Sequence, residues 1–201
     1  MHVVPQLSFF SADLVEPDVA DLAGVLAAHG QLVRAGELAR VSVVLDAPWR
    51  AQALAELVRA CGVAAEVGLS EEGRPLLRTA ACTELGPLGS QWTKGAVKAV
   101  PAGWIPNGRA LRAWALTAGR GDDAGYLLGL DPHAEDTHSP LAAALSRAGL
   151  AATLLGARGG GPALRISGRR RLTRLVETVG EAPGHAVGAR CWPEVRTPHD
   201  G

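Results

Sequence analysis

The sequence predicts an α/β fold of the α+β type, built from two copies of one half-unit related by pseudo-two-fold symmetry. The main observation is an internal repeat. Residues 54–78 align without gaps on residues 141–165, with nine identical positions. The identities include Gly62/Gly149, Pro75/Pro162 and Arg78/Arg165, where turns and strands would require such residues. Two further observations are glycine-rich turns between β-type runs and apolar stripes at helical spacing.

Each copy predicts a helix, a strand, a turn and a second strand. The expected helices are 49–61 and 139–148, the first strands 64–69 and 151–155, and the second strands 75–80 and 162–167. Gly62 and Gly149 suit the left-handed position after a helix, and Ser139-Pro140 suits a helix start. Each copy follows a strand that ends in Leu-Asp, at 40–46 and 126–131.

Helices are also expected before and after these units. They lie at 19–29 and 109–118, and at 168–179, where an apolar stripe combines Leu172, Leu175, Val176 and Val179. The first strand of the second half is expected to be short or missing. The resulting division is an N-terminal extension at 1–17, a first repeat at 18–85, a linker at 86–108, a second repeat at 109–180 and a flexible tail at 181–201.

Composition limits the classes of function. The 201 residues carry 20 basic and 20 acidic side chains, so the chain is not a generally basic nucleic-acid binder. The cysteines Cys61, Cys82 and Cys191 are too widely spaced for a disulfide framework or a zinc ribbon, which favours reduced thiols and a cytoplasmic location. No signal peptide or membrane span is recognised, and we expect a monomer.

The helix at 19–29 contains the sequence LAGVLAAHG at 22–30, which resembles the LAGLIDADG motif of homing endonucleases. The second half has LRAWALTAG at 111–119, which keeps Leu111 and Gly119. The resemblance implies an αββαββα order in each half, two motif helices packed through small residues, and two sheets forming a saddle on DNA. It also implies that Gly24, Ala27, Ala28 and Ala118 form the contact between the motif helices.

The sequence departs from this family at the metal-binding positions. The family's carboxylate before the last glycine of each motif binds a divalent metal, whereas His29 and Ala118 stand here. The resemblance therefore implies a degenerate, inactive member, similar to the N-terminal domain of the WhiA sporulation regulators. No catalytic residue, metal ligand or cofactor is expected. An active nuclease that uses Asp122 or Asp123 is a less favoured alternative.

Basic residues predict where double-stranded DNA would bind. Acid-free stretches at 91–121 and 157–176 contain clustered Lys and Arg, including Arg158. Strand alternation places Arg165 on the open side of its sheet, with Arg78 in the matching place. The candidate DNA-binding residues are Arg78, Lys94, Lys98, Arg165, Arg169, Arg170 and Arg171. Arg50 is expected on the opposite, helical side.

Other interpretations of these residues remain open. The arginines could form a solvated face, and the acidic first half favours a protein-interaction module that kept the fold and lost DNA binding. The tryptophans near the first basic stretch are more typical of core anchors than of base-stacking platforms. The loop with His133, Glu135, Asp136 and His138 could bind a metal, although helix capping is the default interpretation.

Overall fold

The computed structural model describes residue 12 and residues 16–156, 160–184, 186, 188 and 190–195. Within these residues the first half contains a 3-10 helix η2 (Val19–Leu22), α1 (Ala23–Ala27), β1 (Gln31–Ala35), β2 (Leu38–Val44), α2 (Pro48–Ala60), β3 (Ala65–Leu69), β4 (Pro75–Thr79) and α3 (Gly86–Trp92). A short hairpin follows, with β5 (Thr93–Lys94) and β6 (Val97–Lys98). The second half contains α4 (Gly108–Ala118), β7 (Gly119–Gly121), β8 (Tyr126–Gly129), η3 (Glu135–Thr137), α5 (His138–Arg147), β9 (Thr153–Leu155), β10 (Ala163–Ile166) and α6 (Arg169–Val179).

The two halves share one topology, αββαββα, as the sequence predicts. Each half forms a four-stranded antiparallel sheet, with strand orders β1-β2-β4-β3 and β7-β8-β10-β9. The repeat extends to single hydrogen bonds: Leu45 N donates to Pro75 O at 2.8 Å, and Leu130 N donates to Pro162 O at 2.9 Å. The duplicated α+β fold is therefore confirmed.

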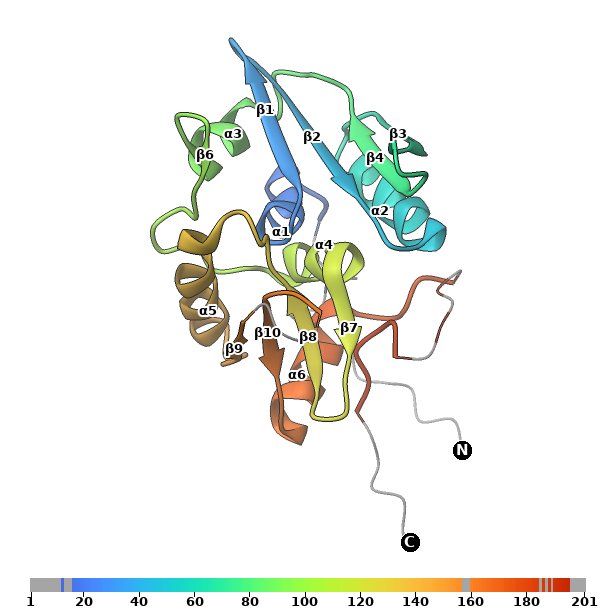
Figure 1. The fold of residues 1–201 in the computed structure, drawn as a ribbon, viewed down its shortest axis with the longest axis vertical. Helices are drawn as coiled ribbons and strands as arrows, with labels where there is room; N and C mark the ends of the chain where they lie inside the picture. The colour runs from blue at the N-terminus through green and yellow to red at the C-terminus, as the bar shows by residue number, and fades with distance from the viewer. Residues whose placement is uncertain are drawn as a thin grey trace, which may run out of the picture.

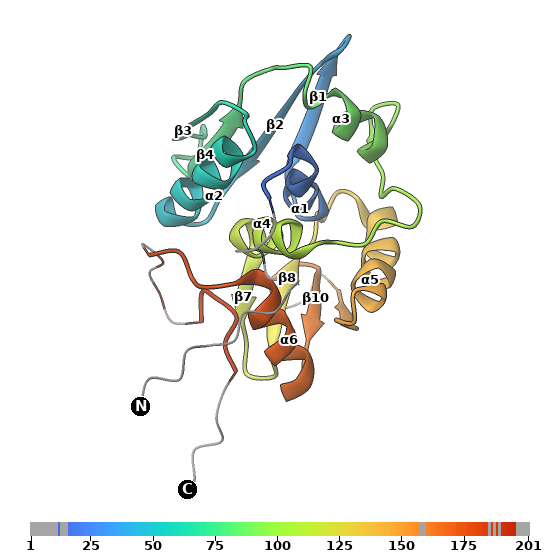
Figure 2. The same ribbon diagram turned by 180° about the vertical axis from the view of Figure 1, so that it is seen from behind.

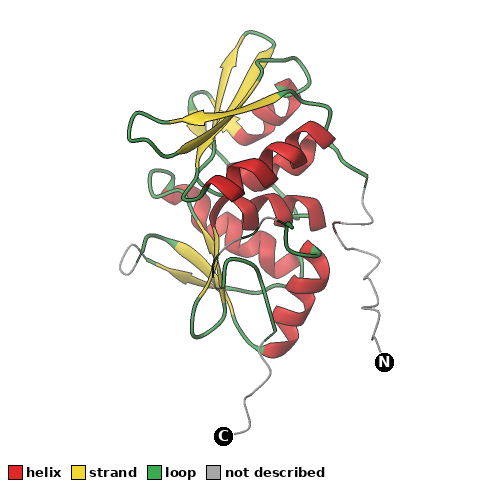
Figure 3. Cartoon of the chain, turned by 90° about the vertical axis from the view of Figure 1, so that its right-hand side faces the viewer, coloured by secondary structure: helices red, strands yellow, loops and turns green. Residues whose placement is uncertain are grey.

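The helices cover one side of both sheets and leave the other side open. In Figure 1 the strands of the two sheets lie in front of α2 and α6, and in the reverse view of Figure 2 α2 and α6 lie in front of their sheets. In Figure 3 the strands of both sheets lie on the left and the helices on the right. Strand alternation explains this arrangement, because Val41 and Val43 of β2 enter the core while Arg40 and Ser42 point to the helix-free face.

The centre of the molecule is the contact between α1 and α4. Gly24 allows this contact, since a Cβ atom at Gly24 would lie 1.9 Å from Ala110 O and 2.8 Å from Trp114 N. The expected packing of the two motif helices through Gly24 is confirmed. Ala27 and Ala28 are buried as well, whereas Ala118 lies against Gly129 of β8.

The expected element boundaries are confirmed in part. Strand β7 has only three residues, so the first strand of the second half is short, as expected. In contrast, α3 and the β5–β6 hairpin occupy 86–98, where a linker was expected. Helix α5 begins at His138 after Thr137, so Ser139 is not the N-cap and Pro140 is not the first helical residue. Gly62 and Gly149 do adopt the left-handed conformation, with φ values of 80° and 77°.

Candidate nucleic-acid interface

The helix-free faces carry one arginine at the same place in each sheet. Arg78 of β4 lies across from Ser42 of β2, and Arg165 of β10 lies across from Leu127 of β8. These strand pairs occupy corresponding positions in the two sheets, so the two arginines are equivalent in structure as well as in the sequence repeat. Both side chains project from the centre of their sheet, away from the helices.

The surroundings of the two arginines differ. Arg165 Nη2 lies 2.7 Å from Asp122 Oδ2 in an ion pair, and its Nε donates to the same oxygen at 2.9 Å. Asp122 belongs to the turn between β7 and β8. Arg78 is exposed, and within the described residues its guanidinium makes no hydrogen bond or ion pair, although the exposed Glu66 lies across from it on β3.

The two candidate lysines occupy different environments. Lys94 is exposed in β5. Lys98 is directed inward: its side chain is 11% exposed, its Nζ lies 2.7 Å from Asp131 Oδ2, and it donates to Ala28 O at 3.0 Å. Burial lowers the pKa of Lys98, and the hydrogen bond and charge of Asp131 oppose that effect. Lys98 therefore ties the end of α1 to the second half, away from exposed surface.

The arginines at the start of α6 are exposed. Arg169, Arg170 and Arg171 form the first turn of the helix, whose N-cap residue Gly168 supplies no side-chain cap. They line an open hollow of about 1030 Å³. Arg171 Nη1 donates to Ser167 O at 3.0 Å. Arg158 lies outside the described residues.

The ends of α1 and α4 meet a pocket of about 270 Å³ that is lined by residues of both halves. His29 lies at this pocket, and its Nε2 is 2.8 Å from Val44 O. Ala118 lines the same pocket from α4 and offers only a methyl group. The basic residues Arg74 and Arg120 lie at its wall, and the acid Asp46 is paired with Arg50 at 2.9 Å.

The loop at 133–138 does not assemble into a metal site. Among the described residues no three His, Cys, Asp or Glu side chains are placed to hold a metal ion. His138 is buried, with Nε2 2.8 Å from Asp131 O, while Glu135 and Asp136 are exposed. His133 contributes its backbone, which donates to Asp131 Oδ1 at 3.0 Å.

Arg50 lies in helix α2, on the helical side where it is expected, and it is a structural residue. Its side chain is only 5% exposed and reaches the C-terminal end of α4. There it donates to Ala115 O at 2.8 Å, Leu116 O at 3.1 Å and Gly119 O at 2.5 Å. Positive charge near the last carbonyls of a helix is favourable, so Arg50 acts as a C-terminal cap supplied by α2.

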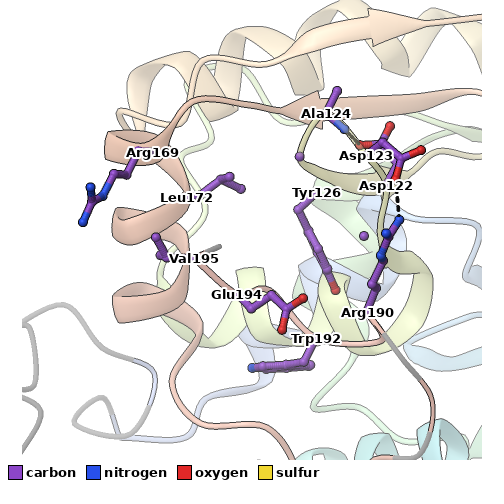
Figure 4. A pocket seen from close by; sticks show the side chains of 12 residues that line it. Asp122, Asp123, Ala124, Tyr126, Arg169, Leu172, Arg190, Trp192, Glu194 and Val195 are labelled. Carbon is purple, nitrogen blue, oxygen red and sulfur yellow. Dashed lines mark hydrogen bonds and ion pairs between the residues drawn. The ribbon is translucent and has the colours of Figure 1, made fainter. Parts of the chain in front are cut away.

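The described residues near the C-terminus pack against the second sheet. Gly121 N donates to Arg190 O at 2.8 Å, and Arg190 Nη1 lies 2.7 Å from Asp123 Oδ1. Trp192 is 9% exposed and donates from Nε1 to Gly180 O at 3.0 Å. Figure 4 shows these side chains around a pocket of about 200 Å³ beside Tyr126. Arg190 thus holds the turn that carries Asp122 and Asp123.

The architecture defines a LAGLIDADG-like fold. Two solved structures have a similar fold over most of this chain and most of their own. The homing endonuclease I-WcaI bound to its DNA recognition sequence is 11% identical, with a TM-score of 0.57 over 88% of this chain and 89% of that chain. The N-terminal LAGLIDADG domain of DUF199/WhiA is 13% identical, with a TM-score of 0.55 over 83% of this chain and 84% of that chain.

A third solved structure with a similar fold is that of a longer protein. Full-length DUF199/WhiA from Thermatoga maritima is 17% identical, with a TM-score of 0.58, and the match covers 88% of this chain and 57% of that chain. No protein-family model and no curated protein matches the sequence. Within the described residues, no helix is long and apolar enough to span a bilayer.

Proposed function

We propose that this protein binds double-stranded DNA without cleaving it, as a regulatory protein that acts as a monomer. The helix-free faces of the two sheets would lie toward the duplex. The observation that carries the proposal is the placement of Arg78 and Arg165 at equivalent central positions on these faces. One chain supplies both sheets, so a second copy is not needed to complete the surface.

The proposed lack of cleavage follows from the pocket at the ends of α1 and α4. A hard divalent cation needs oxygen ligands. His29 offers an imidazole that already contacts Val44 O, and Ala118 offers no ligand atom. The remaining acid at this pocket, Asp46, is paired with Arg50.

Fluorescence anisotropy with a labelled mixed-sequence duplex, titrated from 50 to 200 mM salt, tests DNA binding. We expect a slope of log K against log salt of about −4.5, since each phosphate contact contributes about −0.9. The five contacts would come from the exposed cations Arg78, Lys94, Arg169, Arg170 and Arg171. Arg78→Ala should reduce the magnitude of this slope by about one. Arg59→Ala is the matched control, because Arg59 is an exposed arginine on helix α2.

A nicking assay on supercoiled plasmid with Mg²⁺ or Mn²⁺ tests the absence of cleavage. We expect no nicked product. Metal-dependent nicking that disappears in Asp122→Ala or Asp123→Ala would instead establish a nuclease centred on the β7–β8 turn.

A protein-interaction module is the second candidate function. The favouring observation is the apolar and acidic part of the first helix-free face, where Val33 is 65% and Leu38 is 43% exposed and where Glu66 lies beside Arg78. Failure to bind any duplex at 50 mM salt would refute DNA binding and leave this function in its place.

A further inference from the structure

Arg165 is held in one orientation by the turn beside it. A single oxygen of Asp122, Oδ2, contacts both Nε and Nη2 of Arg165. Its other oxygen, Oδ1, accepts the backbone N–H of Ala124 at 2.9 Å, and its own N–H donates to Gly125 O at 2.9 Å. The β7–β8 turn therefore fixes the carboxylate of Asp122, and this carboxylate fixes the guanidinium of Arg165. Figure 4 shows Asp122 at this turn, next to the ion pair of Asp123 and Arg190.

The donors that remain on Arg165 form a fork. A guanidinium has five N–H groups: one on Nε and two on each Nη. Asp122 occupies the side formed by Nε and Nη2, which leaves both N–H groups of Nη1 and one of Nη2. Within the described part of the chain, the Arg165 side chain has no other hydrogen bond or ion pair. The free donors lie at the end of the guanidinium, and the side chain is 33% exposed on the helix-free face.

A fork of this kind matches one base. Guanine presents two acceptors, O6 and N7, side by side in the major groove, and a bidentate arginine is the most common contact to them. A phosphate can also accept such a fork, but it does not require that the guanidinium be held in advance. Leu127, directly across from Arg165, is apolar and offers no side-chain acceptor that would compete.

Arg78 provides the internal comparison. It occupies the equivalent place in the first sheet, it is exposed, and no described residue holds its guanidinium. A loosely held arginine suits a phosphate contact, which requires charge without a fixed direction. The two halves thus present one oriented and one unrestrained arginine at matching positions.

We infer that Arg165, positioned by Asp122, reads a guanine base in the major groove of bound DNA, while Arg78 contacts phosphate. The inference rests on the proposed function and gives Arg165 a specificity-determining role. This role differs from the one that the sequence predicts for Arg165, which is a phosphate contact with no base preference.

The test starts from a pool of randomised duplexes, enriched on the wild-type protein and sequenced. We expect guanine to be fixed at one or more positions. Arg165→Lys keeps the charge but removes the fork, so it should abolish the preference at one guanine position, with a loss there of about 5- to 150-fold. Its salt slope on a mixed-sequence duplex should stay unchanged, because a base contact releases no counterion. Asp122→Asn should weaken the same preference without weakening binding to the mixed-sequence duplex.

Three results separate the possibilities, after thermal melting has shown that each variant folds. Loss of one guanine preference in Arg165→Lys, with an unchanged salt slope, supports the inference. Wild-type binding without any base preference, or a preference that survives in Arg165→Lys, overturns the inference and leaves DNA binding intact. Failure of the wild-type protein to bind any duplex refutes the proposed function itself.

Discussion

Gly24→Ala tests the contact between α1 and α4 on which the fold depends. In an isolated helix this change would be stabilising by about 1 kcal/mol, because glycine is a poor helix former. Here the new methyl group would lie 1.9 Å from Ala110 O. Real Cβ atoms essentially never lie closer than 3.0 Å to such an atom, so the two helix backbones must separate by at least about 1.1 Å at this point.

This separation would loosen the packing around Leu26, Leu111 and Trp114, all of which are buried. Forced separation of well-packed elements costs about 1–3 kcal/mol. The overlap at Gly24 is severe, so we expect a cost at the upper end, about 3 kcal/mol. Less the helix gain of about 1 kcal/mol, this gives a net loss of about 2 kcal/mol in the free energy of unfolding and a fall in Tm of about 4–8 °C for a chain of this size. Urea denaturation and differential scanning calorimetry measure the two quantities.

Gly68→Ala is the control for Gly24→Ala. Gly68 lies in strand β3, and a Cβ atom there would meet nothing within 4 Å. It should leave the Tm unchanged or raise it slightly. If Gly24→Ala also raised the Tm, α1 and α4 would not be in contact at Gly24, and the central packing described above would be wrong.

Three other changes have defined outcomes. Arg50→Met removes the donors to three carbonyls at the end of α4 and should lower the free energy of unfolding, measured by urea titration, by at least about 2 kcal/mol. Asp46 is 75% exposed, so Asp46→Asn should cost less than about 1 kcal/mol in the same titration. Burial raises the pKa of Asp131, but hydrogen bonds from Lys98 and the His133 amide outweigh that effect and lower it. The ionised carboxylate of Asp131 therefore stabilises the fold above about pH 4, and this stabilisation is lost as the pH falls through the pKa of the folded state. Between pH 5 and pH 2 the free energy of unfolding should fall more for the wild type than for Asp131→Asn. Parallel curves of unfolding free energy against pH for the two proteins would contradict this. Burial, with the charge of Asp21, raises the pKa of Cys61 to about 11. Because the thiolate is the reactive form, iodoacetamide at pH 8 should alkylate Cys61 at least about 100-fold more slowly than free cysteine. Mass spectrometry of a Cys82→Ser, Cys191→Ser variant, in which Cys61 is the remaining cysteine, measures this rate.

The sequence predicts the duplicated topology because local signals recur in both halves. The left-handed Gly62 and Gly149 end equivalent helices, and alternation along β10 places Arg165 on the open face. The limits of β7 and α3 are harder to predict. A three-residue strand carries almost no periodic signal, and α3 is rich in glycine and begins with a Gly-Pro pair that is equally typical of a loop.

The candidate interface shows a different limit. The sequence identifies Lys98 and Arg165 as basic residues, but their roles depend on acids that are 33 and 43 positions away, Asp131 and Asp122. Such pairs form only when distant segments meet, so charge counting along the chain cannot distinguish an exposed cation from a partnered one. The Leu-Asp pairs that follow β2 and β8 are the local signal for Asp46 and Asp131.

The two cations that cap the central helices make each half depend on the other. Arg50 comes from the first half and binds the carbonyls of α4, and Lys98 bridges Ala28 O at the end of α1 to Asp131 of the second half. A fragment that ended near residue 100 would keep Arg50 without the three carbonyls of α4 that it binds, and the other fragment would keep Asp131 without its lysine. Separately expressed halves would therefore be unstable alone and stable together, so a chain cut between β6 and α4 should reassemble from its two pieces.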